Sequence, residues 1–131
     1  MTASRTKAAQ PSIVIQRAYD EPTPRDGYRV LVDRFWPRGR SKQVLALDEW
    51  ARDLAPDPAL IRWFAHDPAR WEEFRTRYRG ELAGAAQRVR LRDMLAAAGR
   101  RRMTLVYGAR SEIENQAVVL REALQAIASS A

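Results

Sequence analysis

Short apolar runs alternate with longer amphipathic segments along the chain, and together they predict an α/β fold. Residues 12–17, 28–33 and 103–107 are rich in Val, Ile, Leu and Tyr, a composition typical of β-strands. The middle of the second run is apolar at three consecutive positions. This pattern favours a central strand that is covered on both faces.

Helices are expected where apolar residues recur every three or four positions. The segments with this spacing are residues 47–54, 58–64, 68–82, 89–98 and 111–128. In the first of them, Leu47, Trp50 and Leu54 share one face. The third is expected to bury Trp71, Phe74, Tyr78 and Leu82, and the last to bury Ile113, Ala117, Leu120, Leu124 and Ile127.

Local signals mark the ends of these helices. Asp57 and Asp67 each precede a proline, and an Asp N-cap before a proline in the first turn is a strong helix start. Gly84 marks a break after the third helix. Ser111, with Glu114 three residues later, is the expected N-cap of the last helix.

The order of elements predicts a single compact α/β domain over residues 12–128, with a short, largely parallel sheet flanked by helices. Residues 1–11 are small, polar and mildly basic, and they lack the apolar core of a secretory signal. We expect them to form a disordered tail. No apolar stretch approaches the roughly 18 residues that a membrane helix needs, so we predict no membrane association.

Composition narrows the chemistry. The 131 residues include no cysteine, which excludes disulfides, thiol nucleophiles and cysteine-based metal sites and fits a cytoplasmic location. His66 is the single histidine, so a His-rich metal site is excluded as well, and we predict neither a metal nor a cofactor. The formal net charge is +7, which favours nucleic acid, anionic metabolites or acidic partners. An Arg-rich chain of this kind also fits ordinary solvated helix faces.

Polar side chains follow two of the predicted strands. Because the carboxyl ends of parallel strands meet at one edge of a sheet, where ligands usually bind, we expect these side chains to converge. The candidate ligand-binding set is Asp33, Arg34, Trp36, Arg38, Tyr107, Arg110 and Asn115. The three arginines could clamp an anion together with free N–H groups at the start of the last helix. Asp33 could hold an arginine in place or act as an acid or base.

Structural explanations compete with this interpretation. Asp33 could form a salt bridge with Arg34 or Arg110 that only closes the end of a strand. Trp36 and Trp50 could be core or rim packing rather than a ligand wall. His66 precedes an Asp-Pro helix start, which favours a capping or hydrogen-bonding role over catalysis.

Several stretches resemble one bacterial family. They are residues 27–39 (GYRVLVDRFWPRG), 47–50 (LDEW), 66–68 (HDP), 71–74 (WEEF) and 104–107 (TLVY), together with Asn115. The chain is similar to the domain of unknown function 488 family, in particular its short, YeaO-like branch. The resemblance implies a small α/β domain without an established reaction.

The same resemblance bears on catalysis. In the broader family, some members place a Cys and a His around the start of the last helix as a plausible reactive pair, and this chain has no Cys. In close relatives a His usually follows the matching Asn, whereas here Asn115 is followed by Gln116. An amide can donate and accept hydrogen bonds but cannot shuttle a proton.

The sequence therefore favours a binding module for an anionic ligand, either a small molecule or nucleotide or a nucleic acid. One alternative is an enzyme that acts on a phosphorylated or nucleotide-like substrate, with Asp33 as acid or base and Tyr107 or Asn115 orienting the substrate. Another is a structural or interaction domain whose strand-end residues only brace the fold. The oligomeric state is left open.

Overall fold

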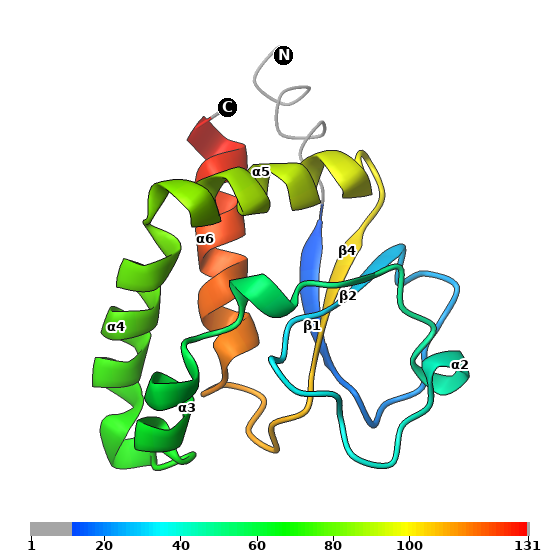
Figure 1. Cartoon of the computed structure of the whole chain (residues 1–131). Helices are drawn as coiled ribbons and strands as arrows, with labels where there is room; N and C mark the ends of the chain where they lie inside the picture. Colours follow the sequence, from blue (N-terminus) through cyan, green and yellow to red (C-terminus); the bar gives the residue numbers. More distant parts are fainter. Residues whose placement is uncertain (1–11, 131) are drawn as a thin grey trace.

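The computed structural model describes residues 12–130 and has a four-stranded parallel sheet at its centre (Figure 1). The strands are β1 (Ile13–Arg17), β2 (Tyr28–Leu31), β3 (Glu49–Trp50) and β4 (Met103–Tyr107), in the order β1-β4-β2-β3. The helices are α2 (Lys42–Leu45), α3 (Pro58–Phe64), α4 (Trp71–Leu82), α5 (Ala85–Ala98) and α6 (Gln116–Ser130). Short 3₁₀ turns occupy Arg52–Leu54 (η1) and Pro68–Arg70 (η2). The predicted α/β class and parallel sheet are confirmed, whereas the predicted tail lies outside the described residues.

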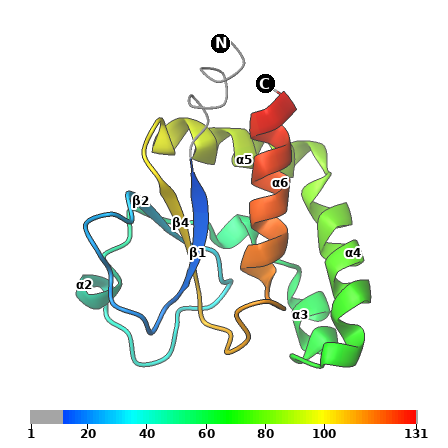
Figure 2. The ribbon, with the colours of Figure 1, turned by 180° about the vertical axis from the view of Figure 1, so that it is seen from behind.

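The sheet separates two apolar layers. β4 is buried along its whole length between β1 and β2. α6 runs alongside β1 in both views, and α4 and α5 pack against α6 (Figures 1 and 2). On the opposite face, Leu31 and Val106 pack with Leu45 of α2. The central strands are therefore covered on both sides, as the apolar run in β2 predicts.

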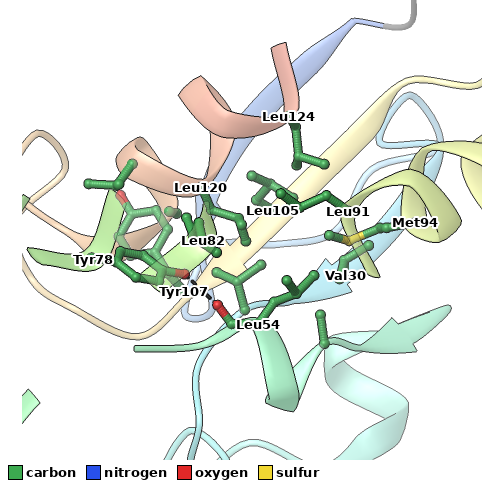
Figure 3. Close-up of a cluster of buried hydrophobic side chains, with 14 of the residues drawn as sticks. Val30, Leu54, Tyr78, Leu82, Leu91, Met94, Leu105, Tyr107, Leu120 and Leu124 are labelled. Atoms are coloured by element: carbon green, nitrogen blue, oxygen red, sulfur yellow. Dashed lines mark hydrogen bonds between the residues drawn. The ribbon is translucent and has the colours of Figure 1, made fainter. Parts of the chain in front are cut away.

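The larger layer holds the main core (Figure 3). Its fully buried side chains come from the sheet and all three long helices and include Val30, Leu91, Leu105, Leu120 and Leu124. Tyr78 is buried among them, and its hydroxyl donates a hydrogen bond to the Leu54 carbonyl at 2.6 Å. A buried phenol needs such a partner, so this bond joins α4 to η1.

One predicted helix is wrong. Residues 47–54 form β3 and η1 instead. β3 pairs in parallel with β2, and the Ala51 N–H donates to the Leu31 carbonyl at 2.8 Å. A helix of eight residues leaves most of its backbone groups without partners, whereas the free edge of β2 offers partners to an extended chain.

The start of the last helix also differs from the prediction. α6 begins at Gln116, and Asn115 acts as its cap, because the Asn115 Oδ1 accepts from the Val118 N–H at 3.2 Å. Ser111 closes an earlier turn, in which its Oγ accepts from the Glu114 N–H at 3.0 Å. The loop between β4 and α6 is consequently longer than the sequence indicates.

Most of the predicted buried faces are confirmed. The α4 stripe Trp71, Phe74, Tyr78 and Leu82 is buried, as are Ala117, Leu120 and Leu124 of α6, and Ile127 is partly buried. Ile113 is 75% exposed, because it lies in the loop before α6 rather than on the helix. The break at Gly84 is confirmed as well, with α5 starting at Ala85, four residues earlier than expected. None of the helices within residues 12–130 combines the length and apolarity needed to cross a membrane.

Candidate functional site

A cavity of about 260 Å³ lies beside the carboxyl ends of β2 and β4. It is bounded by the loop after β2, the loop after β4, α3 with the turn that follows it, one side chain of α4 and the first residue of α6. The lining residues are Asp33, Arg34, Phe35, Trp36, Pro37, Pro56, Ile61, Phe64, His66, Phe74, Gly108, Ala109 and Gln116. The strand ends therefore converge as predicted, and they meet a wall of aromatic side chains.

Asp33 is the acidic group of this cavity. Its Oδ2 accepts a hydrogen bond from the Gly108 N–H at 2.8 Å, and its Oδ1 accepts from the Gln116 side-chain amide. Both donors are neutral, and no ion pair within 4 Å among residues 12–130 includes Asp33. The alternative of a strand-end salt bridge with Arg34 or Arg110 is therefore wrong.

This environment changes the acidity of Asp33. Burial raises the pKa of Asp33 from 3.8 to about 6, although the hydrogen bonds from Gly108 and Gln116 oppose the rise. Desolvation disfavours the charged form of a carboxyl group, and here no cation offsets it. A Cβ at Gly108 would lie 2.9 Å from the Asp33 Oδ2, so a larger residue there would displace the carboxylate.

Arg34 holds a neighbouring loop and keeps part of its guanidinium free. Its Nε donates to the Pro56 carbonyl at 3.0 Å and its Nη2 to the Ala55 carbonyl at 3.1 Å. Its Nη1 has no hydrogen-bond partner among the described residues and is not among their buried unpaired atoms. Arg34 lines this cavity and also a neighbouring hollow that includes Asp57 and Glu81.

The two tryptophans differ in position. Trp36 lines the cavity, and its Nε1 donates to the Arg40 carbonyl at 2.5 Å. Trp50 packs edge-on against Trp36, with ring centroids 5.3 Å apart, and its Nε1 donates to the Asp33 carbonyl at 2.7 Å. Trp36 therefore lines the cavity and also packs against Trp50. Trp50 does not line the cavity, and its hydrogen bond to the Asp33 carbonyl supports the loop after β2.

The other four candidate residues do not line the cavity. Tyr107 is buried in the main core, and Asn115 caps α6 while its Nδ2 donates to the Ser111 carbonyl at 2.8 Å. Arg38 and Arg110 are exposed, and within the described part of the chain neither guanidinium has an ion-pair or hydrogen-bond partner. The structure therefore brings together Asp33, Arg34 and Trp36 from the predicted set.

Several cavity residues lie outside that set. Phe64 and Phe74 stack with centroids 4.3 Å apart and form an aromatic wall. His66 also lines the cavity, at 6.0 Å from the Phe64 ring, and it follows Ala65 in a pair of consecutive residues with positive φ. Positive φ at non-glycine residues is uncommon and often marks functional sites, yet it leaves no trace in a sequence.

The described residues do not form a metal site. Within residues 12–130, no group of three or more His, Cys, Asp or Glu side chains is arranged to hold a metal ion. The cavity instead offers one carboxylate, one partly free guanidinium and five aromatic rings, counting His66 with the Phe and Trp side chains. Its chemistry is therefore that of hydrogen bonding and stacking.

Comparison with known proteins agrees with this architecture. Residues 12–130 match the family described as the inactive DUF488-N3 subclade. The chain belongs to this family. The resemblance found in the sequence is thereby confirmed, and the DUF488-N3 match spans the sheet, the cavity and all described helices.

The chain also has relatives of nearly its own length. It is 39% identical over 117 residues to "Uncharacterized protein YeaO" of Escherichia coli K12, covering 88% of this chain and 99% of YeaO. It is 38% identical over 110 residues to "Uncharacterized protein Rv3073c" of Mycobacterium tuberculosis, covering 84% and 91% of the two chains. No solved structure matches.

Proposed function

We propose that this protein is a small cytoplasmic nucleotide-binding module, with the base in the cavity and the phosphate at its arginine-flanked mouth. The observation that carries the proposal is the cavity itself, in which a carboxylate without a cationic partner faces aromatic walls. Its volume of about 260 Å³ is slightly below that of typical ligand pockets, which start at roughly 300 Å³. A single base suits this volume.

Both features of the cavity match a nucleobase. Stacking of a base on an aromatic side chain contributes about 1–3 kcal/mol, and the exposed Phe35 and the partly buried Trp36 provide such surfaces along the cavity. The ring N–H and amino groups of a base are hydrogen-bond donors, and an ionised carboxylate only accepts hydrogen bonds. Asp33 would disfavour a bare phosphate in the same place because both are anionic.

Two exposed arginines adjoin lining residues of the cavity in the sequence. Arg38 and Arg110 follow the lining residues Pro37 and Ala109 closely in sequence, and both are exposed. Together with the net charge of +7, they favour an anionic group at the mouth. This arrangement supports a nucleotide over either an uncharged base or inorganic phosphate.

A binding role is favoured over catalysis by the groups that surround Asp33. The chain has no cysteine, and the side chain that contacts Asp33 from α6 is an amide, which cannot carry a proton. The description of the matching family as inactive supports the same conclusion. One observation favours an enzyme instead, namely the pKa of about 6 at Asp33 in a cavity that also holds His66.

Isothermal titration calorimetry tests the proposal. The ligands are the four ribonucleoside 5′-monophosphates, ribose 5-phosphate, inorganic phosphate and a short single-stranded oligonucleotide. We expect at least one mononucleotide to bind more tightly than ribose 5-phosphate and phosphate. The Phe35→Ala substitution removes an aromatic wall that is 62% exposed, and we expect it to weaken nucleotide binding by roughly 5- to 100-fold.

Ile113→Ala is the matched control, because Ile113 is also apolar and exposed but does not line the cavity. It should leave the affinity unchanged. Absence of binding by every mononucleotide, or equal binding of phosphate and nucleotides, would contradict the proposal. Chromatography of the same mixtures distinguishes an enzyme from a binding module. A new product would support catalysis instead of binding alone.

A further inference from the structure

We propose that the cavity selects guanine among the common nucleobases, through the free hydrogen-bonding positions of Asp33 and Arg34. This selectivity rests on the nucleotide-binding function proposed above and adds the identity of the base. It follows from the hydrogen bonds that the protein already makes to these two side chains, and from those that it leaves unmade.

Asp33 keeps one acceptor position on each of its oxygens. An ionised carboxylate has about four lone-pair positions, and the protein uses one at Oδ2 for the Gly108 N–H and one at Oδ1 for the Gln116 amide. A ligand that contacts both oxygens from one direction must present two N–H donors side by side. A ligand with a donor beside an acceptor would place its acceptor against a carboxylate oxygen.

Arg34 keeps the complementary donors. Its Nε and one Nη2 hydrogen are directed to the Pro56 and Ala55 carbonyls, which leaves the Nη1 hydrogens and the second Nη2 hydrogen. These remaining hydrogens point from adjacent nitrogens of one planar group, so they can bind two neighbouring acceptors. Both side chains line the cavity, so the proposed base would meet an acceptor pair and a donor pair from consecutive residues.

Guanine carries the matching groups in one continuous series. Its N2 and N1 hydrogens are adjacent donors, and its O6 and N7 atoms, which follow around the ring, are the acceptors to which arginine commonly binds in a bidentate manner. Adenine and cytosine each place an amino donor beside a ring acceptor, and uracil has a single ring N–H between two carbonyls. Of the four bases, guanine alone has two adjacent donors for Asp33.

The first experiment varies the ligand and leaves the protein unchanged. We would titrate the wild-type chain at pH 7.5 with the 5′-monophosphates of guanosine, inosine and adenosine. Inosine lacks only the N2 amino group, so it loses one of the two hydrogen bonds to Asp33. We expect guanosine monophosphate to bind at least about tenfold more tightly than adenosine monophosphate, with inosine monophosphate between them.

The second experiment varies Asp33. Asp33→Asn has nearly the same shape, and its amide can keep both protein contacts if the Gln116 amide turns over. The new side chain offers one acceptor and one donor, which no longer matches guanine. We expect it to remove the preference for guanosine over inosine monophosphate. Asp53→Asn, at an exposed acid that does not line the cavity, should preserve the preference.

Each result has a distinct meaning. A guanosine preference that Asp33→Asn removes supports the inference. Equal binding of guanosine, inosine and adenosine monophosphates by the wild type overturns guanine selectivity but leaves nucleotide binding intact. A preference that persists in Asp33→Asn also overturns the inference, because another group must then read the base. Failure of every mononucleotide to bind overturns the selectivity and the proposed function together.

Discussion

Two aspartates at opposite ends of β2 have opposite environments. Asp26, just before the strand, pairs with the buried guanidinium of Arg29 at 2.7 Å and accepts hydrogen bonds from the N–H and hydroxyl of Thr23. Asp33, just after the strand, has only the neutral donors of Gly108 and Gln116. One acid therefore has a counter-charge within the protein and the other has none.

The cluster before β2 makes many contacts of its own, although the buried Nη2 of Arg29 has no hydrogen-bond partner among the described residues. Arg29 also donates to the Leu45 carbonyl at 2.9 Å and to Gln16 at 2.5 Å, and the Thr104 hydroxyl donates to the Asp26 carbonyl at 2.7 Å. Burial alone would raise the pKa of Asp26, but the hydrogen bonds from Thr23 and the Arg29 charge lower it below its usual value. Such a network joins the loop before β2 to three neighbouring segments.

The contrast supports the proposed binding site at the carboxyl end of β2. A buried acid with a full set of partners contributes to the uniqueness of the fold and offers nothing to a ligand. A buried acid without a cation destabilises the folded state and retains free acceptor positions, a combination common at functional sites. Substitution of either aspartate tests this contrast, and the expected changes in the free energy of unfolding have opposite signs.

The largest effect is expected from Asp26→Ala. It leaves the Arg29 guanidinium, which is only 4% exposed, without its counter-charge, and breaking a buried pair in this way costs about 3–5 kcal/mol. Urea unfolding followed by circular dichroism measures the change. Asp53→Ala, at an exposed acid, is the control and should stay within about 0.5 kcal/mol of the wild type. A loss below about 1 kcal/mol for Asp26→Ala would remove the contrast between the two ends.

A smaller effect of opposite sign is expected from Asp33→Asn. The pKa of Asp33 rises from 3.8 to about 6 on folding, so between these values the folded state binds the proton more tightly than the unfolded state. The contribution of Asp33 to the free energy of unfolding of the wild type therefore falls as the pH rises from about 4 to about 6. Above about pH 6 this contribution is constant. The full difference corresponds to about 3 kcal/mol at neutral pH.

Thermal unfolding at several pH values tests this sign. Asp33→Asn should be more stable than the wild type at pH 7.5, by up to about 3 kcal/mol, and the advantage should vanish below about pH 4. Asp26 supplies the internal reference, because its lowered pKa gives stability that is lost as the pH falls below its ordinary value. An advantage of Asp33→Asn that is independent of pH would show that burial of the charge is not its cause.

The sequence was sufficient for three of the four strands and for the place at which the candidate residues after β2 and β4 meet. The three apolar runs gave β1, β2 and β4, and the Asp-Pro pairs gave the starts of α3 and η2. Since parallel strands end at one edge, the residues after β2 and β4 had to meet there. The contact between Asp33 and Gly108 is a direct consequence of that topology.

Other features depend on tertiary contacts that leave no local signal. β3 exists because the edge of β2 is free, although the spacing of Leu47, Trp50 and Leu54 equally fits a helix. Gln116 reaches Asp33 across 83 positions of the chain, and its place at the start of α6 depends on a loop whose length the sequence does not reveal. Nor does the sequence show that Arg38 and Arg110 are exposed and do not line the cavity.

The smallest effect, and the sharpest test of the Asp33 site, is expected from Gly108→Ala. A Cβ at Gly108 would lie 2.9 Å from the Asp33 Oδ2 and would push the carboxylate away from the Gly108 N–H. Weakening this hydrogen bond to a charged group should cost about 1–2 kcal/mol. Gly80→Ala is the control, because nothing lies within 4 Å of a Cβ at that helical position, and it should stabilise the protein by about 0.5–1 kcal/mol.

A double-mutant cycle shows whether this cost arises from Asp33. In an Asp33→Ala background no carboxylate meets the new methyl group, and Gly108 does not need positive φ, so the same substitution should be neutral or slightly stabilising. The cycle should therefore give a coupling of about 1–2 kcal/mol between the two positions. Equal costs in both backgrounds would mean that Gly108 is required by the backbone alone, and that the loop after β4 does not hold Asp33 in place.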